Sequence, residues 1–512
     1  MQHVEADEPH AGAKAGAREW MGLAIIALPC LIYSMDLTVL YLAVPQITAD
    51  LRPSASQLLW IVDIYGFLVA GSLITMGTLG DRLGRRRVLL IGAGAFAATS
   101  VLAAYATSAQ MLIVARALQG IAAATLAPST LSLIRNVFHN AGQRATAIGI
   151  WVAAFSVGAV IGPLVGGVIL AHFWWGAVFL INVPAMLALI AAGPFLLPEF
   201  RDENAGRPDI LSAAQSIIAV LAVIYGLKRV AEDGWAVLPL LSIALGLVVG
   251  YAFYRRQRRL ADPLIDVELF RAPAFSAALA INLVGLFMVL GTFLFIAQYL
   301  QLVLAMGPLE AAFWTAPAGV VFALGSLSAP ILVRHFKAAN VTACGFLLAA
   351  TGYILLTQIT AVPPPWRMLT GMLALSIGIA PLGAITTDIV LAAAPPNRAG
   401  AASAISETSF EFGGALGIAL LGSLLTFIYR SDISGVQLAG IAPWALEAAQ
   451  DTLGGAVDAA KGLPHADAAR LLAAARASFV HAFIVTSAVS AVFSLLAAVM
   501  AALLLRRAPR HS

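Results

Sequence analysis

Residues 77–87 read GTLGDRLGRRR and lie between two long apolar runs, near 57–79 and 87–107. The glycines permit a tight turn and a close approach of the flanking segments. Asp81 can accept charge-assisted hydrogen bonds from the neighbouring arginines or from helix ends, so the cluster can hold two helices in one arrangement and release them in another. Anchoring on the positive inner side of a membrane would explain the arginines, but not the Gly/Asp spacing. The residues of this loop that we single out are Gly77, Gly80, Asp81, Arg82, Gly84, Arg85 and Arg86.

The composition predicts an all-α integral membrane protein. The 512 residues are 61% hydrophobic and 11% charged, against about 45–50% and about 25% for soluble domains. Apolar runs of roughly 20 residues recur along the chain, and each can cross a bilayer of about 30 Å as a helix. A closed β-barrel would show alternation over roughly 10 residues instead. The candidate spans lie near 19–41, 57–79, 87–107, 110–134, 145–169, 174–197, 209–229, 235–254, 274–300, 309–333, 340–360, 366–391, 401–429 and 478–505.

A faint internal repeat divides these fourteen spans into two halves. Gly71-Ser72-Leu73 recurs as Gly325-Ser326-Leu327, and Arg144-Ala145-Thr146-Ala147 aligns with Arg398-Ala399-Gly400-Ala401 at the same offset. Two parallel halves are a common way to place a transporter's site at the midplane. We therefore expect a tail, two six-helix bundles and an inserted helix pair between the bundles. Their predicted ranges are 1–18 for the tail, 19–197 and 274–505 for the bundles, and 209–254 for the pair.

The distribution of Lys and Arg predicts the orientation. Most of them fall in segments on the side of the N-terminus, whereas the short loops on the opposite side hold only Arg52, Lys228, Arg229 and Arg367. Basic residues favour the cytoplasmic side, so we expect a multi-pass protein of the cell inner (plasma) membrane with both termini in the cytoplasm.

Segment 430–477 is the one long insertion outside the apolar runs, and this topology places it on the extracellular side. Its apolar residues recur at helical spacing, which predicts a hairpin of two short helices joined near residues 462–464. We expect the hairpin to act as a lid over the exit path. The alternative is a disordered loop without a role.

Five carboxylates inside apolar spans predict the chemistry: Asp36, Asp63, Asp388, Glu407 and Glu411. A charge at the bilayer centre costs roughly 2.5–3.5 kcal/mol even on insertion scales, so such residues indicate function. Glu407 and Glu411 share one helix face, and their mutual repulsion in a low dielectric favours keeping a proton that a cation can replace. For Asp388 a structural pairing with Arg398 remains an alternative. Arg116 is a counter-charge for a nearby acid, or it extends to the interface.

Further motifs accompany these acids. Residues 35–39 read MDLTV, 60–65 read WIVDIY, and 116–120 read RALQG. A stripe of small residues that favours close helix packing consists of Gly158, Gly162, Pro163, Gly166 and Gly167.

Together with residues 77–87, these motifs resemble the major facilitator superfamily. Within it, the chain resembles the fourteen-helix drug:proton antiporters, most of all the Qac-type exporters of quaternary ammonium compounds and dyes. The resemblance implies a proton-coupled multidrug efflux antiporter that works by alternating access and confers antibiotic resistance. It implies that Asp36, Glu407 and Glu411 contact cationic drug or carry protons, that the glycine stripe is the antiporter motif, and that Arg116 belongs to a family motif. The stretch 317–326 lacks an acid that several relatives have, and Phe322 stands there instead, which argues against broad export of divalent cations.

Aromatic residues could cage lipophilic cations, although most such residues serve in packing. The candidates are Trp60, Trp151, Phe155, Trp314, Phe322 and Phe410. The expected partners are small lipophilic cations, protons and membrane lipids, with no nucleic acid, and the chain is expected to function as a monomer. No metal and no cofactor are expected, with protons as the coupling ion, and the scattered histidines argue against an enzyme. Export of an endogenous metabolite, such as a siderophore or a lipid precursor, remains the alternative.

Overall fold

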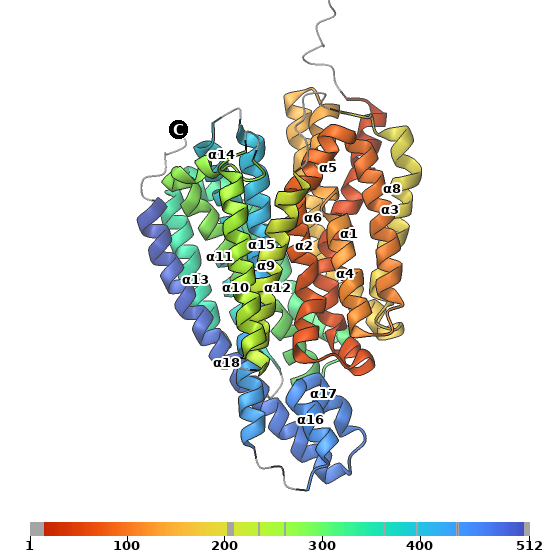
Figure 1. Cartoon of the computed structure of the whole chain (residues 1–512), viewed down its shortest axis with the longest axis vertical. Coiled ribbons are helices and arrows are strands. Elements are labelled where there is room, and N and C mark those ends of the chain that lie inside the picture. Colours follow the sequence, from red (N-terminus) through yellow and green to blue (C-terminus); the bar gives the residue numbers. More distant parts are fainter. Residues whose placement is uncertain are drawn as a thin grey trace, which may run out of the picture.

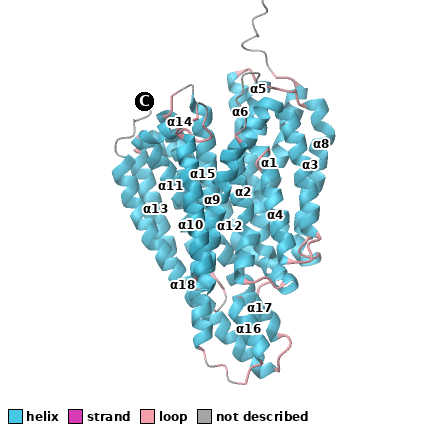
Figure 2. Ribbon diagram, viewed as in Figure 1, coloured by secondary structure: helices cyan, strands magenta, loops and turns pink. Residues whose placement is uncertain are grey.

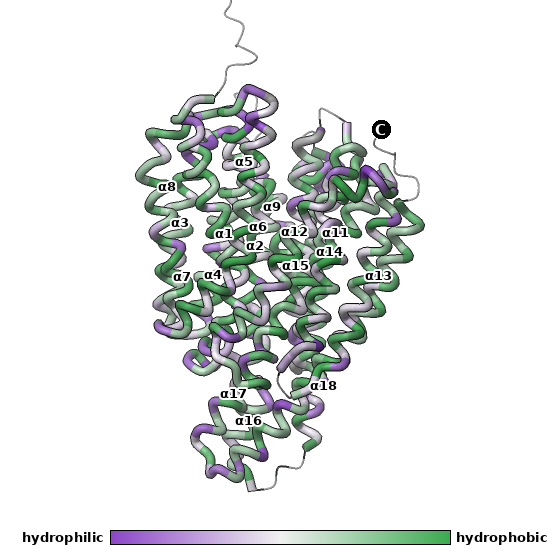
Figure 3. The backbone as a smooth tube through the Cα atoms, turned by 180° about the vertical axis from the view of Figure 1, so that it is seen from behind, coloured by the Kyte–Doolittle hydropathy of each residue, from purple (hydrophilic) through white to green (hydrophobic). Residues whose placement is uncertain are grey.

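The computed structural model describes residues 15–201, 209–233, 236–260, 263–361, 364–395, 398–436, 438 and 440–505. Among these residues the regular structure is entirely helical, without a strand (Figure 2). Fourteen of the described helical segments are long and apolar enough to cross a membrane, which confirms the predicted fold class. Figure 3 shows hydrophobic residues along the helices and hydrophilic residues gathered toward their ends, as expected where lipid surrounds the middle of each helix.

The first half contains six spans built from eight helices. Its helices are α1 (Ala17–Leu51), α2 (Ala55–Leu83), α3 (Arg85–Ala104), α4 (Ala109–Ala123), α5 (Leu126–Val137), α6 (Ala141–His172), α7 (Ala177–Leu180) and α8 (Asn182–Leu196). The predicted span 110–134 is interrupted between α4 and α5, and the span 174–197 begins with the short α7. Residues 1–14 of the predicted tail lie outside the described residues.

The inserted pair and the second half follow. The pair consists of α9 (Ile210–Asp233) and α10 (Val237–Gln257). A short 3₁₀ helix (Val267–Arg271) leads to the second half. Its helices are α11 (Pro273–Gln298) with a π-helical end (Tyr299–Val303), α12 (Pro308–His335), α13 (Ala338–Leu356), α14 (Trp366–Ala393), α15 (Ala399–Gly435), α16 (Pro443–Asp451), α17 (Leu453–Ala460) and α18 (His465–Leu504).

The two halves lie side by side, and α9 and α10 run along them at the junction (Figure 1). Helix α9 packs against α2 of the first half and α15 of the second. Helices α16 and α17 extend beyond the bundle at one end, which we call the hairpin end. We call the opposite end, where α1 begins and α18 finishes, the terminal end.

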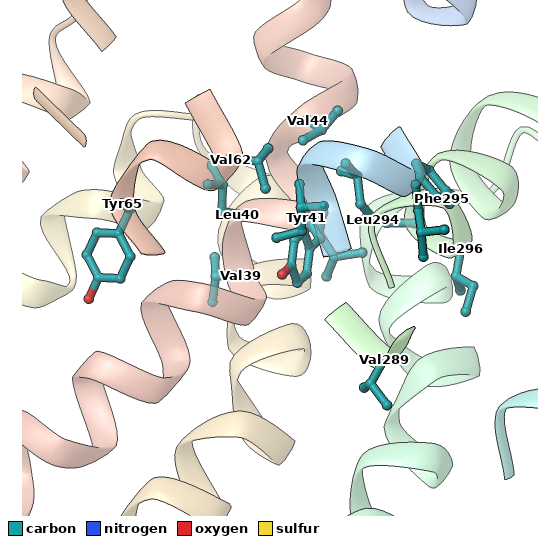
Figure 4. Close-up of a cluster of buried hydrophobic side chains, with 14 of the residues drawn as sticks. Val39, Leu40, Tyr41, Val44, Val62, Tyr65, Val289, Leu294, Phe295 and Ile296 are labelled. Atoms are coloured by element: carbon teal, nitrogen blue, oxygen red, sulfur yellow. The ribbon is translucent and has the colours of Figure 1, made fainter. Parts of the chain in front are cut away.

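Contacts that join the halves gather toward the hairpin end. The Gln301 amide donates to the Leu42 carbonyl at 3.1 Å, and α6 packs against α12 around Gly167, where a methyl group would lie 3.0 Å from Ala312. Figure 4 shows Tyr41 and Val44 of α1 near Leu294 and Phe295 of α11, within one buried apolar cluster. The halves are therefore held together on the hairpin side of the midplane.

Local sequence explains where α2 begins and ends. The Ser54 hydroxyl accepts from the Gln57 amide at 3.3 Å, and the Gln57 side chain accepts from the Ser54 amide at 2.9 Å, forming a capping box. At the other end Gly84 has φ 111°, a conformation that favours glycine. A side chain there would also meet Glu199, because a methyl group at Gly84 would lie 2.5 Å from its Oε1 atom.

The described part of the hairpin is helical but differs from the prediction in two respects. The first predicted helix is two helices, α16 and α17, because Thr452 interrupts it and caps α17 by accepting from the Gly455 amide at 2.9 Å. The second is the beginning of α18, which continues without a break into the last span. The hairpin is also tied to the first half, since Arg52 forms a 3.2 Å ion pair with Asp458.

Candidate functional site

Asp36 is the acceptor at the centre of a buried polar network in the first half. The Arg116 Nη1 atom lies 2.6 Å from Asp36 Oδ2, and the amides of Asn182 and Gln119 donate to Asp36 Oδ1 at 2.8 and 3.4 Å. Both amides also donate to the Ser100 hydroxyl. Side chains from several helices thus surround one carboxylate and supply donors to both of its oxygens.

Arg116 does not extend to the interface. Its side chain is 0% exposed, and its guanidinium lies 4.3 Å from the centroid of the Tyr65 ring. Of the two predicted roles, the geometry supports the counter-charge for a nearby acid.

Asp63 has a basic partner that the sequence places elsewhere. Its Oδ2 atom lies 2.7 Å from the Nζ atom of Lys228, and the two residues are 1% and 2% exposed. The sequence predicts Lys228 in an outer loop, but α9 continues to Asp233 and carries this lysine inside the protein. The Lys228 ammonium also lies 3.8 Å from the centroid of the Trp60 ring, a cation–π distance.

The two glutamates of α15 have a different environment. The Tyr33 hydroxyl donates to Glu411 Oε1 at 2.6 Å across the junction of the halves, and Glu411 is buried. Glu407 is half-buried one turn away and acts electrostatically on Glu411, Tyr33 and Cys30. Among the residues that the structure describes, no Lys, Arg or His forms an ion pair with either glutamate.

Aromatic rings of the first half cluster around Tyr33, the donor to Glu411. Tyr33 lies 5.7 Å from Phe155 and 6.1 Å from Tyr65, and Phe155 lies 4.8 Å from Trp151 between ring centroids. The indole of Trp151 donates to the Thr130 hydroxyl at 3.0 Å. Two of the predicted aromatic residues, Trp151 and Phe155, therefore belong to this group.

The other predicted aromatic residues lie elsewhere. Trp60 holds Lys228, and Trp314 packs edge-on against Trp366 at 5.0 Å. Phe322 lines a small apolar cavity inside the second half. Phe410 lies beside Gly383 of α14. The structure thus does not bring the six into one cage.

Asp388 lies on α14, toward the terminal end. Arg398, its predicted alternative partner, forms ion pairs with Asp266 and with Glu268, the latter at 3.2 Å.

The 77–87 loop binds within its own half. The Arg85 Nε atom donates to Asp81 at 2.7 Å, and Arg86 donates from its main chain to Glu199 at 3.0 Å and from its side chain to the Leu197 carbonyl at 3.0 Å. Gly77 approaches Pro128, whereas Gly80 packs on Arg85 and Arg82 is exposed. The loop therefore ties α2 and α3 to the end of α8.

The glycine stripe of α6 packs on α1. A methyl group at Gly158, Gly162 or Gly166 would lie within 2.8 Å of α1 atoms. Gly167 faces α12 instead, and Pro163 lies inside the helix. Helix α6 therefore packs on α1 with one face and on α12 of the second half with another.

Sequence analysis missed several members of the site: Tyr33, Tyr65, Gln119, Asn182 and Lys228. A signal existed for Tyr33, which precedes Asp36 by three residues and so shares its helix face. Gln119 shares a face with Arg116 for the same reason. Asn182 and Lys228 carried no local signal, because their partners lie far away in the chain.

Residues 26–418 match the family model described as Major Facilitator Superfamily. The multidrug efflux pump LfrA of Mycolicibacterium smegmatis is 41% identical over 490 residues, covering 96% of this chain and 97% of that protein. The methyl viologen resistance protein SmvA of Salmonella typhimurium is 35% identical, covering 90% and 93%. A solved bacterial homolog of the human lysosomal transporter Spinster shares the fold, with a TM-score of 0.64, 20% identity and coverage of 95% and 98%.

Proposed function

The chain belongs to the major facilitator superfamily, and from this premise we propose that it exports lipophilic monovalent cations, such as quaternary ammonium compounds and dyes, in exchange for protons. It is a multi-pass membrane transporter rather than an enzyme, and its relatives include drug-efflux and resistance proteins. The finer claims, cation selectivity and proton coupling, rest on Glu411 and Glu407. Glu411 is buried with an aromatic group around its donor Tyr33, Glu407 is half-buried one turn away, and neither has a basic partner among the described residues.

The exchange follows from competition for the two carboxylates. Because no described basic residue pairs with them, the glutamates are neutralised either by protons or by a cation, since an uncompensated charge in this environment is costly. A cation that binds displaces a proton, and a proton that binds displaces the cation. Aromatic faces at Tyr33, Trp151 and Phe155 favour a lipophilic cation over a hydrated one. Alternating access to the two sides then converts this competition into antiport.

The Tyr33–Glu411 hydrogen bond links the exchange to movement, since its two residues belong to different halves. A change in the charge of Glu411 alters this bond and hence the preference between arrangements of the halves. We place the terminal end in the cytoplasm, with the hairpin outside, and assign the energy supply to protons, without a metal or an organic cofactor and with the monomer as the working unit.

Transport by the purified protein in liposomes tests the proposal. An imposed pH gradient should drive accumulation of tetraphenylphosphonium, and a protonophore should abolish it. Glu407→Gln, which keeps the shape of the side chain, should transport nothing. Transport that survives the protonophore, or transport by Glu407→Gln at the normal rate, would contradict the proposal.

A dication sharpens the test, because methyl viologen carries two positive charges and gives one relative its name. Export of tetraphenylphosphonium without methyl viologen supports selectivity for monovalent cations. Equal export of both would remove that part of the proposal.

The hairpin is proposed to act as a lid. It is joined to the first half by the Arg52–Asp458 ion pair and to α15 by the Tyr429 hydroxyl, which donates to the Ala449 carbonyl at 2.7 Å. Replacing residues 436–464 with a short Gly/Ser linker spares α15 and α18. Substrate binding should persist while transport falls severely; an unchanged transport rate would exclude the lid.

A further inference from the structure

Trp60, Asp63 and Lys228 form a group that the exchange at α15 does not use. The Lys228 ammonium contacts a carboxylate at 2.7 Å and an aromatic face at 3.8 Å from its centroid. A carboxylate beside an aromatic face is the combination that recognises alkylammonium ions. Both parts of the recognition surface come from α2, whereas the cation comes from α9.

Apolar contacts already hold α9 in place. Ile217 of α9 lies against Gly71 of α2, where a methyl group would be 2.4 Å from Ile217 Cγ1. Ile224 of α9 packs in one buried cluster with Phe67 of α2 and Ala419 of α15. A buried ion pair is often no more stabilising than well-packed apolar residues of the same volume. Docking of α9 therefore does not by itself account for the buried charges.

We propose that Trp60 and Asp63 form a cation-binding site for an alkylammonium group, and that the chain's own Lys228 fills it. The lysine keeps its proton and the aspartate stays ionised, so the pair is neutral as a whole. Asp63 is thereby withheld from the exchange of protons and substrate. Only this last consequence rests on the proposed function; occupation of the site by lysine does not.

Other charged groups near α2 are engaged elsewhere. On α4, Arg116 binds Asp36, and on α15, Glu411 accepts from Tyr33. Arg229, which follows Lys228, has its guanidinium 5.8 Å from the centroid of the Tyr225 ring. These partners leave the Lys228 ammonium as the group that neutralises Asp63.

Chemical rescue tests the site. Lys228→Ala removes three carbons and the ammonium, which n-propylammonium can replace. The variant should melt at a lower temperature than the wild type, and n-propylammonium should raise its Tm with increasing concentration, because a ligand that binds only the folded state stabilises it. Two controls should show no rescue: 1-propanol in place of the amine, and Asp63→Asn/Lys228→Ala in place of the single variant. Equal stabilisation of the single and double variants by the amine would overturn the proposal.

A second measurement does not depend on that variant folding. Lys228→Met keeps an unbranched side chain that is one atom shorter and removes the charge, so Asp63 should take up a proton. Infrared difference spectra should then show a protonated-carboxyl band that is missing from the wild type and from Asp63→Asn/Lys228→Met. No such band in Lys228→Met would overturn the masking of Asp63. Neither measurement involves transport, so a failure here is distinct from a failure of the proposed cation export.

Discussion

The carboxylates inside the two halves of the molecule have opposite surroundings. In the first half Asp36 is neutralised by Arg116 and Asp63 by Lys228, each through a short contact between buried side chains. In the second half Glu407 and Glu411 lie one turn apart, and the Tyr33 hydroxyl is the hydrogen-bond donor to Glu411. A buried carboxylate beside a fixed base already has its counter-charge, whereas one without a base can be neutralised by a proton or by a bound cation. In the proposed transport cycle the first half therefore holds fixed charges and the second half exchangeable ones.

Substitution at the exchangeable acids should have the largest effect. Glu407→Gln removes a titratable group without removing a partner from any base, so we expect complete loss of export with the melting temperature preserved. Efflux of tetraphenylphosphonium and the Tm of the purified variant measure the two quantities. An acid of the hairpin, Glu447, provides the control, because Glu447→Gln should export normally. A Glu407→Gln variant that unfolds would place this residue among the fixed charges.

Substitution at a fixed pair should act on stability. In an Asp36→Asn variant the buried guanidinium of Arg116 loses its counter-charge. Removing one partner of a buried pair costs about 3–5 kcal/mol. Arg116→Met leaves the Asp36 carboxylate without its partner, so the free energy of unfolding should fall by about 3–5 kcal/mol. The double variant Asp36→Asn/Arg116→Met removes both charges and should recover much of this loss. Denaturation of the purified variants measures the effect, and equal losses for single and double variants would contradict the pairing.

The hydrogen bond between the halves should have an intermediate effect. Tyr33→Phe removes the donor to Glu411 and little else. A hydrogen bond to a charged group contributes about 1.5–3 kcal/mol, so we expect export to fall by about 10- to 100-fold while the protein stays folded. Phe155→Leu, which changes the same aromatic group without touching the bond, should shift the apparent affinity for the cation more than the maximal rate. Identical kinetics for both variants would contradict this division of roles.

The smallest effect is expected at a pair outside the bilayer. Arg256 binds Asp209 at 3.1 Å where α9 and α10 meet at the terminal end. Burial alone would raise the pKa of Asp209, but hydrogen bonds from Ser212 and Arg256 outweigh it and lower the pKa below its ordinary value. A lowered pKa stabilises the fold above the ordinary value of about 3.9, and this contribution is lost as the pH falls through the folded-state pKa. Arg256→Gln should lower the free energy of unfolding by about 0.5–1 kcal/mol at pH 7. This loss should become smaller as the pH falls below about 3.9, because Asp209 then becomes protonated. Measurement of Tm against pH for the wild type and the variant would show the change.

The sequence predicted the fold well and the partners of the site less well. Apolar runs set the spans because lipid demands them, and the acids of α15 could be placed on one face because helical spacing is local. The position of Lys228 inside the protein could not be predicted. Two basic residues, Lys228 and Arg229, at the end of an apolar run are also typical of a loop that follows a membrane span. The break at Thr452 could not be predicted for a similar reason: apolar spacing continues across it. Contacts such as Asn182 with Asp36 join residues far apart in the chain and depend on packing that no local pattern reports.

The Asp63–Lys228 pair also has a consequence for the synthesis and membrane insertion of the protein. The two residues are 165 positions apart, and a ribosome that adds about 5–20 residues per second needs about 10–30 s to cover that distance. Helix α2 thus reaches the bilayer well before α9 exists. During that interval the side chain of Asp63 needs another source of neutrality, and a proton is the least costly one, because a neutral carboxylic acid is much better tolerated in lipid than a carboxylate. Arrival of α9 then releases this proton, so completion of the fold is itself a titration.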